Sequence, residues 1–238
     1  KEIVLLFFLY VTLLISFFLG ENSTGGAIND YINQKNITTR FANEFKETFL
    51  NYDKYQTRHS PILLIFLSLF EKLNWTDQFI RLVHLHLCLF LPIIFYNCLK
   101  IKYPNFNKKI FLLLSSLIII SPTFRTLSIW PDSRIFGLIF FSLSVLFFLK
   151  FLNNRKFKYA ILNTIFCAVS SYISPNFSVF AIYFFINFII FYKIISTPII
   201  IITILNLFLA FPAIYYILIL EINFFSRSAA IGINLSDK

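Results

Sequence analysis

The chain has 238 residues, of which 58% are hydrophobic and only 13% are charged. Because soluble domains carry about 25% charged residues, this composition excludes a water-soluble globular domain and predicts that lipid surrounds most of the chain. The net charge of +10 does not indicate a nucleic-acid partner, since the basic residues alternate with apolar runs instead of forming one solvated patch.

Apolar runs that resemble membrane spans recur along the whole sequence. A spanning helix needs about 20 apolar residues. We predict spans at 3–19, 79–98, 110–122, 135–152, 160–174, 177–192 and 199–220. The run 61–73 is too short to cross comfortably and ends in Glu71 and Lys72, so we predict a helix that lies at the interface. The predicted fold class is therefore all-α: one polytopic transmembrane domain over 1–238, with a large first non-cytoplasmic loop and interfacial helices at 20–78.

The distribution of lysine and arginine predicts the orientation, because short cytoplasmic loops retain positive charge. If the run 61–73 does not span, ten basic residues and only one acid, Glu2, share the cytoplasmic side. The other ten acids then share the outer side with eleven basic residues. The outer segments are 20–78, 121–134, a short turn at 174–176 and the tail after Glu221.

The first candidate for chemistry is Asp30, which follows the first span in the segment Gly25-Gly26-Ala27-Ile28-Asn29-Asp30. A carboxylate at the membrane surface can remove a proton from an acceptor hydroxyl. Glu21, nearer the span, is the reserve candidate. The structural alternative is that the two glycines form a turn and Asp30 caps the helix that follows.

The second candidate is Arg58-His59-Ser60-Pro61, with Pro61 at a favourable first helical position. Free backbone N–H groups at a helix start, together with Arg58 and His59, can hold a phosphate. The alternative is a plain helix start with an interfacial arginine.

The third candidate is the segment from Arg125 to Arg134, which we expect on a short loop with Trp130-Pro131-Asp132 between the arginines. The two arginines can neutralise a lipid phosphate, either directly or with a divalent metal ion held by Asp132. The alternative is an internal ion pair of Asp132 with Arg134 or Arg125.

Two histidines, His84 and His86, lie inside the predicted span 79–98. They are two residues apart and so face different sides of a helix, which excludes a shared metal while the helix is regular. We expect neutral histidines that hydrogen-bond to a neighbouring helix, and Arg81 can extend its side chain to the interface.

This order of parts resembles the GT-C superfamily of integral-membrane glycosyltransferases, which includes protein O-mannosyltransferases and the lipid A aminoarabinose transferase, over roughly residues 1–220. Members have a first span, a large outer loop with an acidic residue near its start, interfacial helices and a His-Pro-Pro-Leu-like element. Asp30 matches the acidic position, and His59-Ser60-Pro61-Ile62 resembles the second element. The segment 121–134 resembles the second outer loop, which in relatives helps to hold the lipid phosphate or a metal. In two departures, Asn29-Asp30 replaces the acidic pair of protein O-mannosyltransferases, and Ser60 replaces a proline.

The resemblance implies a hexosyl- or pentosyltransferase that moves a sugar from a polyprenyl-phosphate donor to a glycan, lipid or protein acceptor on the non-cytoplasmic face. The resemblance implies that Asp30 is the base. It implies that the donor phosphate is bound by Arg58, His59, Arg125 and Arg134. Asp132 would orient an arginine or a metal. The lipid tail would lie against the spans. We expect a bacterial inner membrane with a periplasmic active face. Because relatives continue beyond 238 residues, the chain is expected to be an N-terminal portion.

Two other classes of function remain open. A transporter or flippase-like protein would use Arg81, His84 and His86 to line a pathway. A purely structural membrane subunit would instead leave Asp30, Arg58 and Asp132 scattered by more than about a helix diameter, roughly 10 Å.

Overall fold

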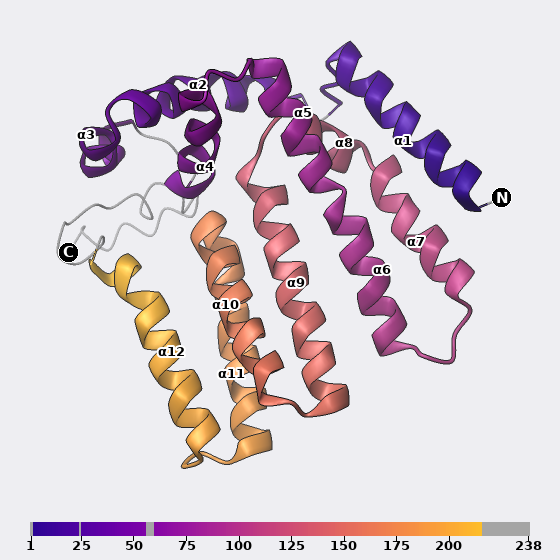
Figure 1. The fold of residues 1–238 in the computed structure, drawn as a ribbon, viewed down its shortest axis with the longest axis vertical. Helices are drawn as coiled ribbons and strands as arrows, with labels where there is room; N and C mark the ends of the chain where they lie inside the picture. The colour runs from indigo at the N-terminus through magenta and orange to yellow at the C-terminus, as the bar shows by residue number, and fades with distance from the viewer. Residues whose placement is uncertain (1, 24, 56–59, 216–238) are drawn as a thin grey trace, which may run out of the picture.

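The computed structural model of the chain describes residues 2–23, 25–55 and 60–215, and regular structure in this described part is entirely helical (Figure 1). This confirms the predicted all-α fold. The helices are α1 (Glu2–Leu19), α2 (Ala27–Asn43), α3 (Phe45–Leu50), η1 (Tyr52–Tyr55), α4 (Pro61–Lys72), α5 (Asp77–Cys88), α6 (Phe90–Lys102), α7 (Lys108–Ile120), α8 (Pro122–Ile129), α9 (Ser133–Asn154), α10 (Phe157–Ile173), η2 (Pro175–Phe177), α11 (Val179–Tyr192) and α12 (Thr197–Ile214).

Five helical segments of the described chain are long and apolar enough to cross a membrane, and the bent pair α7 and α8 makes a sixth if it is counted as one span. The five are α1, α5 with α6, α9, Pro175–Tyr192 and α12. Helix α10, which corresponds to the span predicted at 160–174, is apolar but has only 17 residues and is not among these candidates. These helices identify an integral membrane protein with several spans. Helix α4 has 12 residues and is not among the candidate spans, in keeping with the prediction for 61–73.

Two predicted spans differ from the structure in continuity. The span predicted at 79–98 is a longer segment, Asp77–Lys102, that is interrupted at Leu89. Pro92 has no N–H to donate to the carbonyl four residues earlier, which accounts for a break at this point. The span predicted at 110–122 ends at Ile120, and Pro122 starts α8 at an angle of 60°. Arg125 consequently lies on a helix and not on the loop that the sequence predicts.

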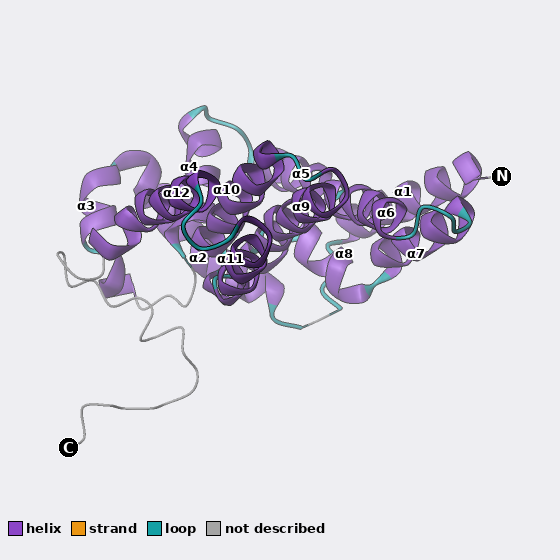
Figure 2. Cartoon of the chain, turned by 90° about the horizontal axis from the view of Figure 1, so that it is seen from below, coloured by secondary structure: helices purple, strands orange, loops and turns teal. Residues whose placement is uncertain are grey.

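The apolar helices stand side by side in an elongated row, from α12 through α10, α9 and α6 to α7 and α1 (Figures 1 and 2). Contacts near the helix ends fix which ends lie together. Asn153 near the end of α9 donates to the Ile101 carbonyl near the end of α6, and Lys109 pairs with Glu2. At the opposite ends, Arg125 pairs with Glu21 just after α1.

The charges are unequally divided between these two ends of the row. The ends of α6, α9 and α11 and the starts of α7 and α10 carry lysines or arginines, namely Lys100, Lys102, Lys108, Lys109, Lys150, Arg155, Lys156, Lys158 and Lys193. The opposite end, which we call the acidic end, carries both signs. Its acids include Glu21, Asp30, Asp77 and Asp132, and its cations include Lys35, Arg81, Arg125 and Arg134. The cationic end is the one that the sequence assigns to the cytoplasm.

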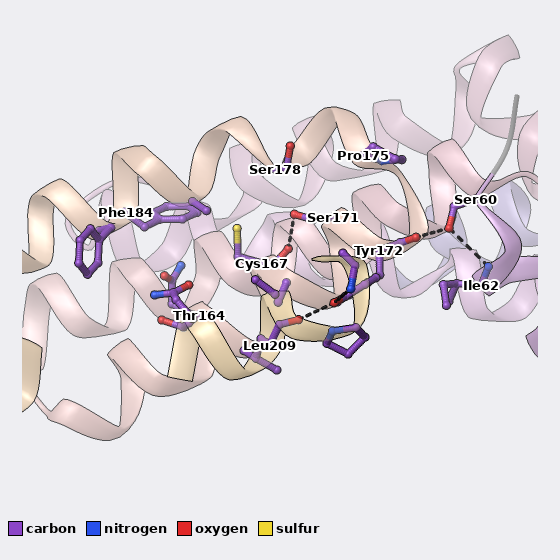
Figure 3. A pocket seen from close by; sticks show the side chains of 18 of the residues that line it. Ser60, Ile62, Thr164, Cys167, Ser171, Tyr172, Pro175, Ser178, Phe184 and Leu209 are labelled. Atoms are coloured by element: carbon purple, nitrogen blue, oxygen red, sulfur yellow. Dashed lines mark hydrogen bonds between the residues drawn. The ribbon is translucent and has the colours of Figure 1, made fainter. Parts of the chain in front are cut away.

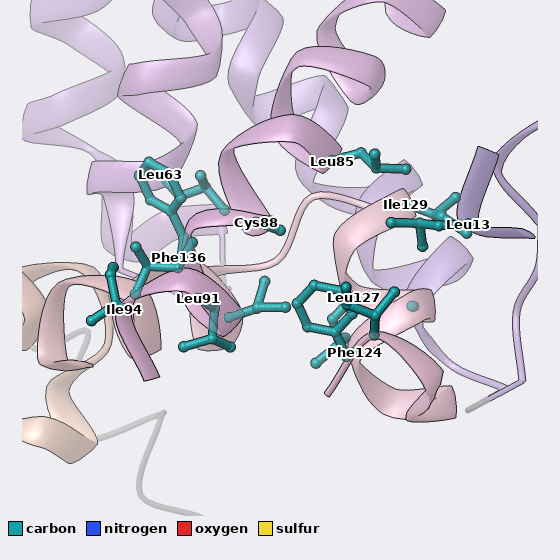
Figure 4. Packing of buried hydrophobic residues seen from close by; sticks show 14 of the residues in the cluster. Leu13, Leu63, Leu85, Cys88, Leu91, Ile94, Phe124, Leu127, Ile129 and Phe136 are labelled. Atoms are coloured by element: carbon teal, nitrogen blue, oxygen red, sulfur yellow. The ribbon is translucent and has the colours of Figure 1, made fainter. Parts of the chain in front are cut away.

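A buried apolar core lies beneath the acidic end, where α1, α4, α5, α8 and α9 converge (Figure 4). Leu13, Leu63, Leu85 and Ile129 are fully buried there, and Phe136 packs beside them. This core sets the relative positions of the helices whose ends carry the acidic groups.

Helices α2 and α4 form a separate layer across the ends of the row (Figure 1). Their contact is apolar, with Ile37, Phe41, Tyr52 and Leu64 in one buried cluster. Ser60 caps α4 by accepting from the Ile62 N–H, and Pro61 is its first residue. The predicted helix start at Ser60-Pro61 is therefore correct.

Candidate functional site

Eight charged side chains gather where α1, α2, α5, α8 and α9 meet at the acidic end. We call them the charged cluster: Glu21, Asp30, Lys35, Asp77, Arg81, Arg125, Asp132 and Arg134. Four are acids and four are cations, so the cluster has no formal excess charge. It combines residues from the predicted outer segments 20–78 and 121–134 with Arg81, which lies in the predicted span 79–98.

Arg134 stands between two carboxylates, those of Asp132 and Asp30. Asp132 is 2% exposed and caps α9, because its Oδ1 accepts from the Arg134 backbone N–H at 2.7 Å. The Arg134 side chain donates from Nε at 2.9 Å and from Nη2 at 2.6 Å to the two Asp132 oxygens. Asp30 lies 3.6 Å from Arg134 Nη2, and its side chain is 46% exposed. The predicted Asp132–Arg134 pair is thus present, and Asp30 is a looser, accessible third member.

Asp30 reaches this position from the first turn of α2. Gly25 has a φ of +78°, a turn conformation that glycine adopts without strain, and Gly26 is the helix N-cap. The predicted glycine turn is correct, but Asp30 does not cap the helix. Its carboxylate lies instead near the positive end of the helix dipole.

Arg125 pairs with Glu21 and not with Asp132, which decides between the two alternatives left open by the sequence. Arg125 Nη2 lies 2.7 Å from Glu21 Oε2, Nε donates to the same oxygen at 2.9 Å, and the arginine also donates to Ser16. Burial alone would raise the pKa of Glu21, but hydrogen bonds from Ser23, Ser16 and Arg125 outweigh it and lower this pKa.

Arg81 is a member of the charged cluster that the sequence analysis did not assign to the site. Its guanidinium lies 3.5 Å from the ring centroid of Trp130 and 5.2 Å from that of Phe17. Nε donates to the Ile129 carbonyl at 3.2 Å, whereas Nη2 is buried with no partner among the described atoms. The signal in the sequence was an arginine inside an apolar run, and only the fold brings Trp130 to it.

Tyr31, Lys35 and Asp77 form a second contact that was not predicted. The Tyr31 hydroxyl donates to Asp77 at 2.6 Å, and Lys35 pairs with the same carboxylate at 2.8 Å. Burial, and then the hydrogen bond to Asp77, raise the pKa of Tyr31. The contact attaches α2 to α5 one residue after Asp30. Sequence spacing could not indicate it, because Tyr31 and Asp77 are 46 residues apart.

The two histidines face different neighbours, as their spacing predicts. His84 is fully buried and its Nδ1 lies 3.0 Å from the Ser128 carbonyl of α8. His86 Nε2 lies 2.8 Å from the Tyr10 hydroxyl of α1. The predicted phosphate ligands Arg58 and His59 lie outside the described residues.

Within residues 2–23, 25–55 and 60–215, no group of three or more His, Cys, Asp or Glu side chains is placed to hold a metal ion. In addition, both Asp132 oxygens accept hydrogen bonds from Arg134. The described residues alone thus do not form a metal centre of three or more protein ligands, and the metal predicted at Asp132 remains a prediction.

The charged cluster combines three properties that acid–base chemistry on an anionic lipid requires. Asp30 is an accessible carboxylate, Arg134 is a cation held in a fixed orientation, and apolar spans begin directly beneath both. Comparison with known proteins adds no family: no family model, no curated protein and no solved structure matches the chain.

Proposed function

We propose that the chain is a membrane glycosyltransferase that moves a sugar from a polyprenyl-phosphate donor to an acceptor on the non-cytoplasmic face. The observation that carries the proposal is the contact of Asp30 with Arg134, 3.6 Å apart at the polar end of apolar spans. A general base beside a cation that can bind an anion, both at the polar end of the spans, suits a lipid donor whose phosphate lies at the membrane surface. The proposal joins this geometry to the GT-C resemblance of the sequence.

In the proposed reaction Asp30 acts as the general base. It takes the proton from an acceptor hydroxyl, whose oxygen attacks the anomeric carbon of the sugar while the bond from that carbon to the phosphate oxygen breaks. The products are the glycosylated acceptor and the free polyprenyl phosphate. Attack from the side opposite the leaving phosphate inverts the anomeric configuration.

Arg134 is proposed to stabilise the negative charge that grows on the leaving phosphate. A guanidinium has five N–H donors, and Asp132 occupies only those of Nε and Nη2. Asp132 therefore orients Arg134 without consuming its capacity for an anion. Arg125, Arg58 and His59 are proposed as further phosphate ligands, of which Arg125 must first loosen its pair with Glu21.

The remaining assignments follow from the same proposal. The isoprenoid tail lies along the exposed apolar faces of the spans, and the cationic end of the row lies in the cytoplasm. A bacterial inner membrane with a periplasmic site fits this orientation. The acceptor is a glycan, a lipid or a protein. A divalent ion held by Asp132 stays part of the prediction, and no step is assigned to it.

A transporter or flippase-like protein is the alternative function. It would use Arg81, His84 and His86 to line one pathway. Arg81 and His84 both lie against α8, at the carbonyls of Ile129 and Ser128, but His86 diverges from them and contacts Tyr10 of α1. This divergence favours the transferase.

The proposal is tested by replacing Asp30 with asparagine, which keeps the shape of the side chain and removes the base. Transfer of labelled sugar from a polyprenyl-phosphate donor is measured in membranes that contain the full-length protein. We expect Asp30→Asn to lose transfer at unchanged expression, whereas Glu47→Gln, an exposed acid on α3, should retain it. Wild-type turnover by Asp30→Asn would remove Asp30 from the mechanism.

A further inference from the structure

A cavity of about 360 Å³ lies between α10, α11 and α12, away from the charged cluster (Figure 3). Ser60 and Tyr172 line it near the layer formed by α2 and α4, and Asn163 and Thr164 line it deeper along α10. Tyr172 follows Asn163 by nine positions along α10, which corresponds to a depth of roughly 13 Å. The volume falls in the range of small-molecule sites, about 300–1,000 Å³.

The described lining of the cavity carries no charged side chain. Its walls are mostly apolar, with Phe184, Phe188 and Leu209 among them. The hydroxyl of Tyr172 donates to the Leu209 carbonyl, and that of Ser171 donates to the Cys167 carbonyl. An ionic group inside the cavity would thus meet no described counter-charge, and burying it would be costly. The described lining therefore favours a neutral ligand.

Among the described lining residues, Asn163 has a buried side-chain acceptor without a hydrogen-bond partner. The residue is fully buried, and its Nδ2 donates to Ser144 on α9, to the carbonyl at 2.9 Å and to the hydroxyl at 2.8 Å. Its Oδ1 is buried with no partner among the described atoms. Buried acceptors in native proteins nearly always have a donor, so this oxygen points to an O–H or N–H group supplied by a ligand.

The two helices that close the cavity are open to the bilayer. Only 11% of the span Pro175–Tyr192 and 11% of α12 is buried, and large apolar side chains on both are exposed. A molecule dissolved in the membrane can therefore approach this site laterally, without crossing the polar end of the row.

We propose that this cavity binds a neutral long-chain lipid alcohol, whose hydroxyl donates to Asn163 Oδ1 and whose hydrocarbon chain fills the apolar walls. The described part of the lining is neutral and selects against a phosphorylated or carboxylated headgroup. The unpaired Asn163 oxygen selects an alcohol over an ether, because an ether has no O–H to donate. No member of the charged cluster lines the cavity, so binding of the alcohol does not require Asp30 or Arg134.

The probe is a photoreactive hexadecanol, crosslinked to the purified full-length protein in phospholipid vesicles, with the labelled peptides identified by mass spectrometry. Unlabelled hexadecanol, its methyl ether, palmitate and a polyprenyl phosphate serve as competitors. We expect labelling of α10 and α12. We also expect hexadecanol to compete roughly tenfold better than the ether, the effect of one lost hydrogen bond, while palmitate and the polyprenyl phosphate compete weakly.

Two variants link this preference to Asn163. In Asn163→Leu the alcohol should lose its advantage over the ether, because the acceptor is gone while the volume is nearly kept. Ala210→Phe narrows the cavity and leaves the bonds of Asn163 to Ser144 intact, so it should reduce labelling altogether. This variant and the wild-type comparison decide the proposal even if Asn163→Leu fails to fold.

Several results would overturn the proposal. Equal competition by alcohol and ether in the wild type would remove the role of Asn163, as would an undiminished preference in Asn163→Leu. Stronger competition by palmitate or by the polyprenyl phosphate would show that a charged lipid occupies the site. Unchanged labelling of Ala210→Phe would place the probe elsewhere.

Discussion

Replacing Asp132 with alanine should destabilise the protein by about 3 kcal/mol. The variant loses the cap of α9, which contributes about 1 kcal/mol. It also loses the charge-assisted bonds from the Arg134 side chain, each contact of this kind being worth about 1.5–3 kcal/mol. The Arg134 side chain is 54% exposed and would still have Asp30 as a neighbour in the variant. We therefore assign about 2 kcal/mol to the lost side-chain bonds, near the lower end of that range.

A matched control separates the two contributions. Asn107 caps α7 by accepting from the Lys109 N–H at 2.9 Å, and its amide is not part of an ion pair. Asn107→Ala should therefore cost only the cap, about 1 kcal/mol. Both variants are compared with the wild type by reversible unfolding in mixed micelles with increasing dodecyl sulfate, followed by far-UV circular dichroism. If Asp132→Ala costs no more than Asn107→Ala, the buried pair with Arg134 does not stabilise this end of the molecule.

Two further predictions concern packing and pH. An alanine Cβ at Gly137 would lie 2.8 Å from the Ser174 Cβ, so Gly137→Ala should destabilise the protein by about 1–3 kcal/mol. A Cβ at Gly26 would meet nothing within 4 Å, so Gly26→Ala should cost less than about 1 kcal/mol in the same unfolding assay. Equal costs would contradict the close contact at Gly137. The lowered pKa of Glu21 means that its ionised form stabilises the fold, fully above its ordinary value of 4.5 and progressively less as the pH falls through the folded pKa below that value. Glu21→Gln should accordingly flatten the decline of stability below pH 4.5, and an identical acid profile would refute this role.

The helical architecture could be predicted because membrane burial constrains sequence strongly. Every span needs a long apolar run, and lysines and arginines mark its ends, so hydropathy alone placed the spans close to where the helices lie. The breaks were harder to predict. Pro92 and Pro122 were visible in the sequence, but whether a proline kinks a helix or starts a new one depends on the neighbours that satisfy the freed backbone groups.

The candidate site was predictable only in part. The sequence places Asp30, Arg125, Asp132 and Arg134 on two predicted outer segments, and in the structure they lie at one end of the row of helices. It could not choose the partner of Arg125, since Glu21 is 104 residues away in the chain. Contacts of this separation are set by how the helices pack, and no local pattern records them.

The cavity beside Asn163 illustrates the same limit. In the sequence this asparagine is one polar residue in an apolar run, and an interhelical hydrogen bond explains it sufficiently. Its bond to Ser144 uses the donor side of the amide, and only the structure reveals that the acceptor side is unpaired beside an apolar cavity.

The central claim is tested most directly by measuring transfer of labelled sugar from a polyprenyl-phosphate donor in sealed vesicles of known orientation that contain the full-length protein. The account predicts donor-dependent transfer when the donor is accessible on the non-cytoplasmic face, and none with Asp30→Asn. Absence of donor-dependent transfer in the wild type on either face, with the protein folded and inserted, would contradict the account and favour a transporter or a structural subunit.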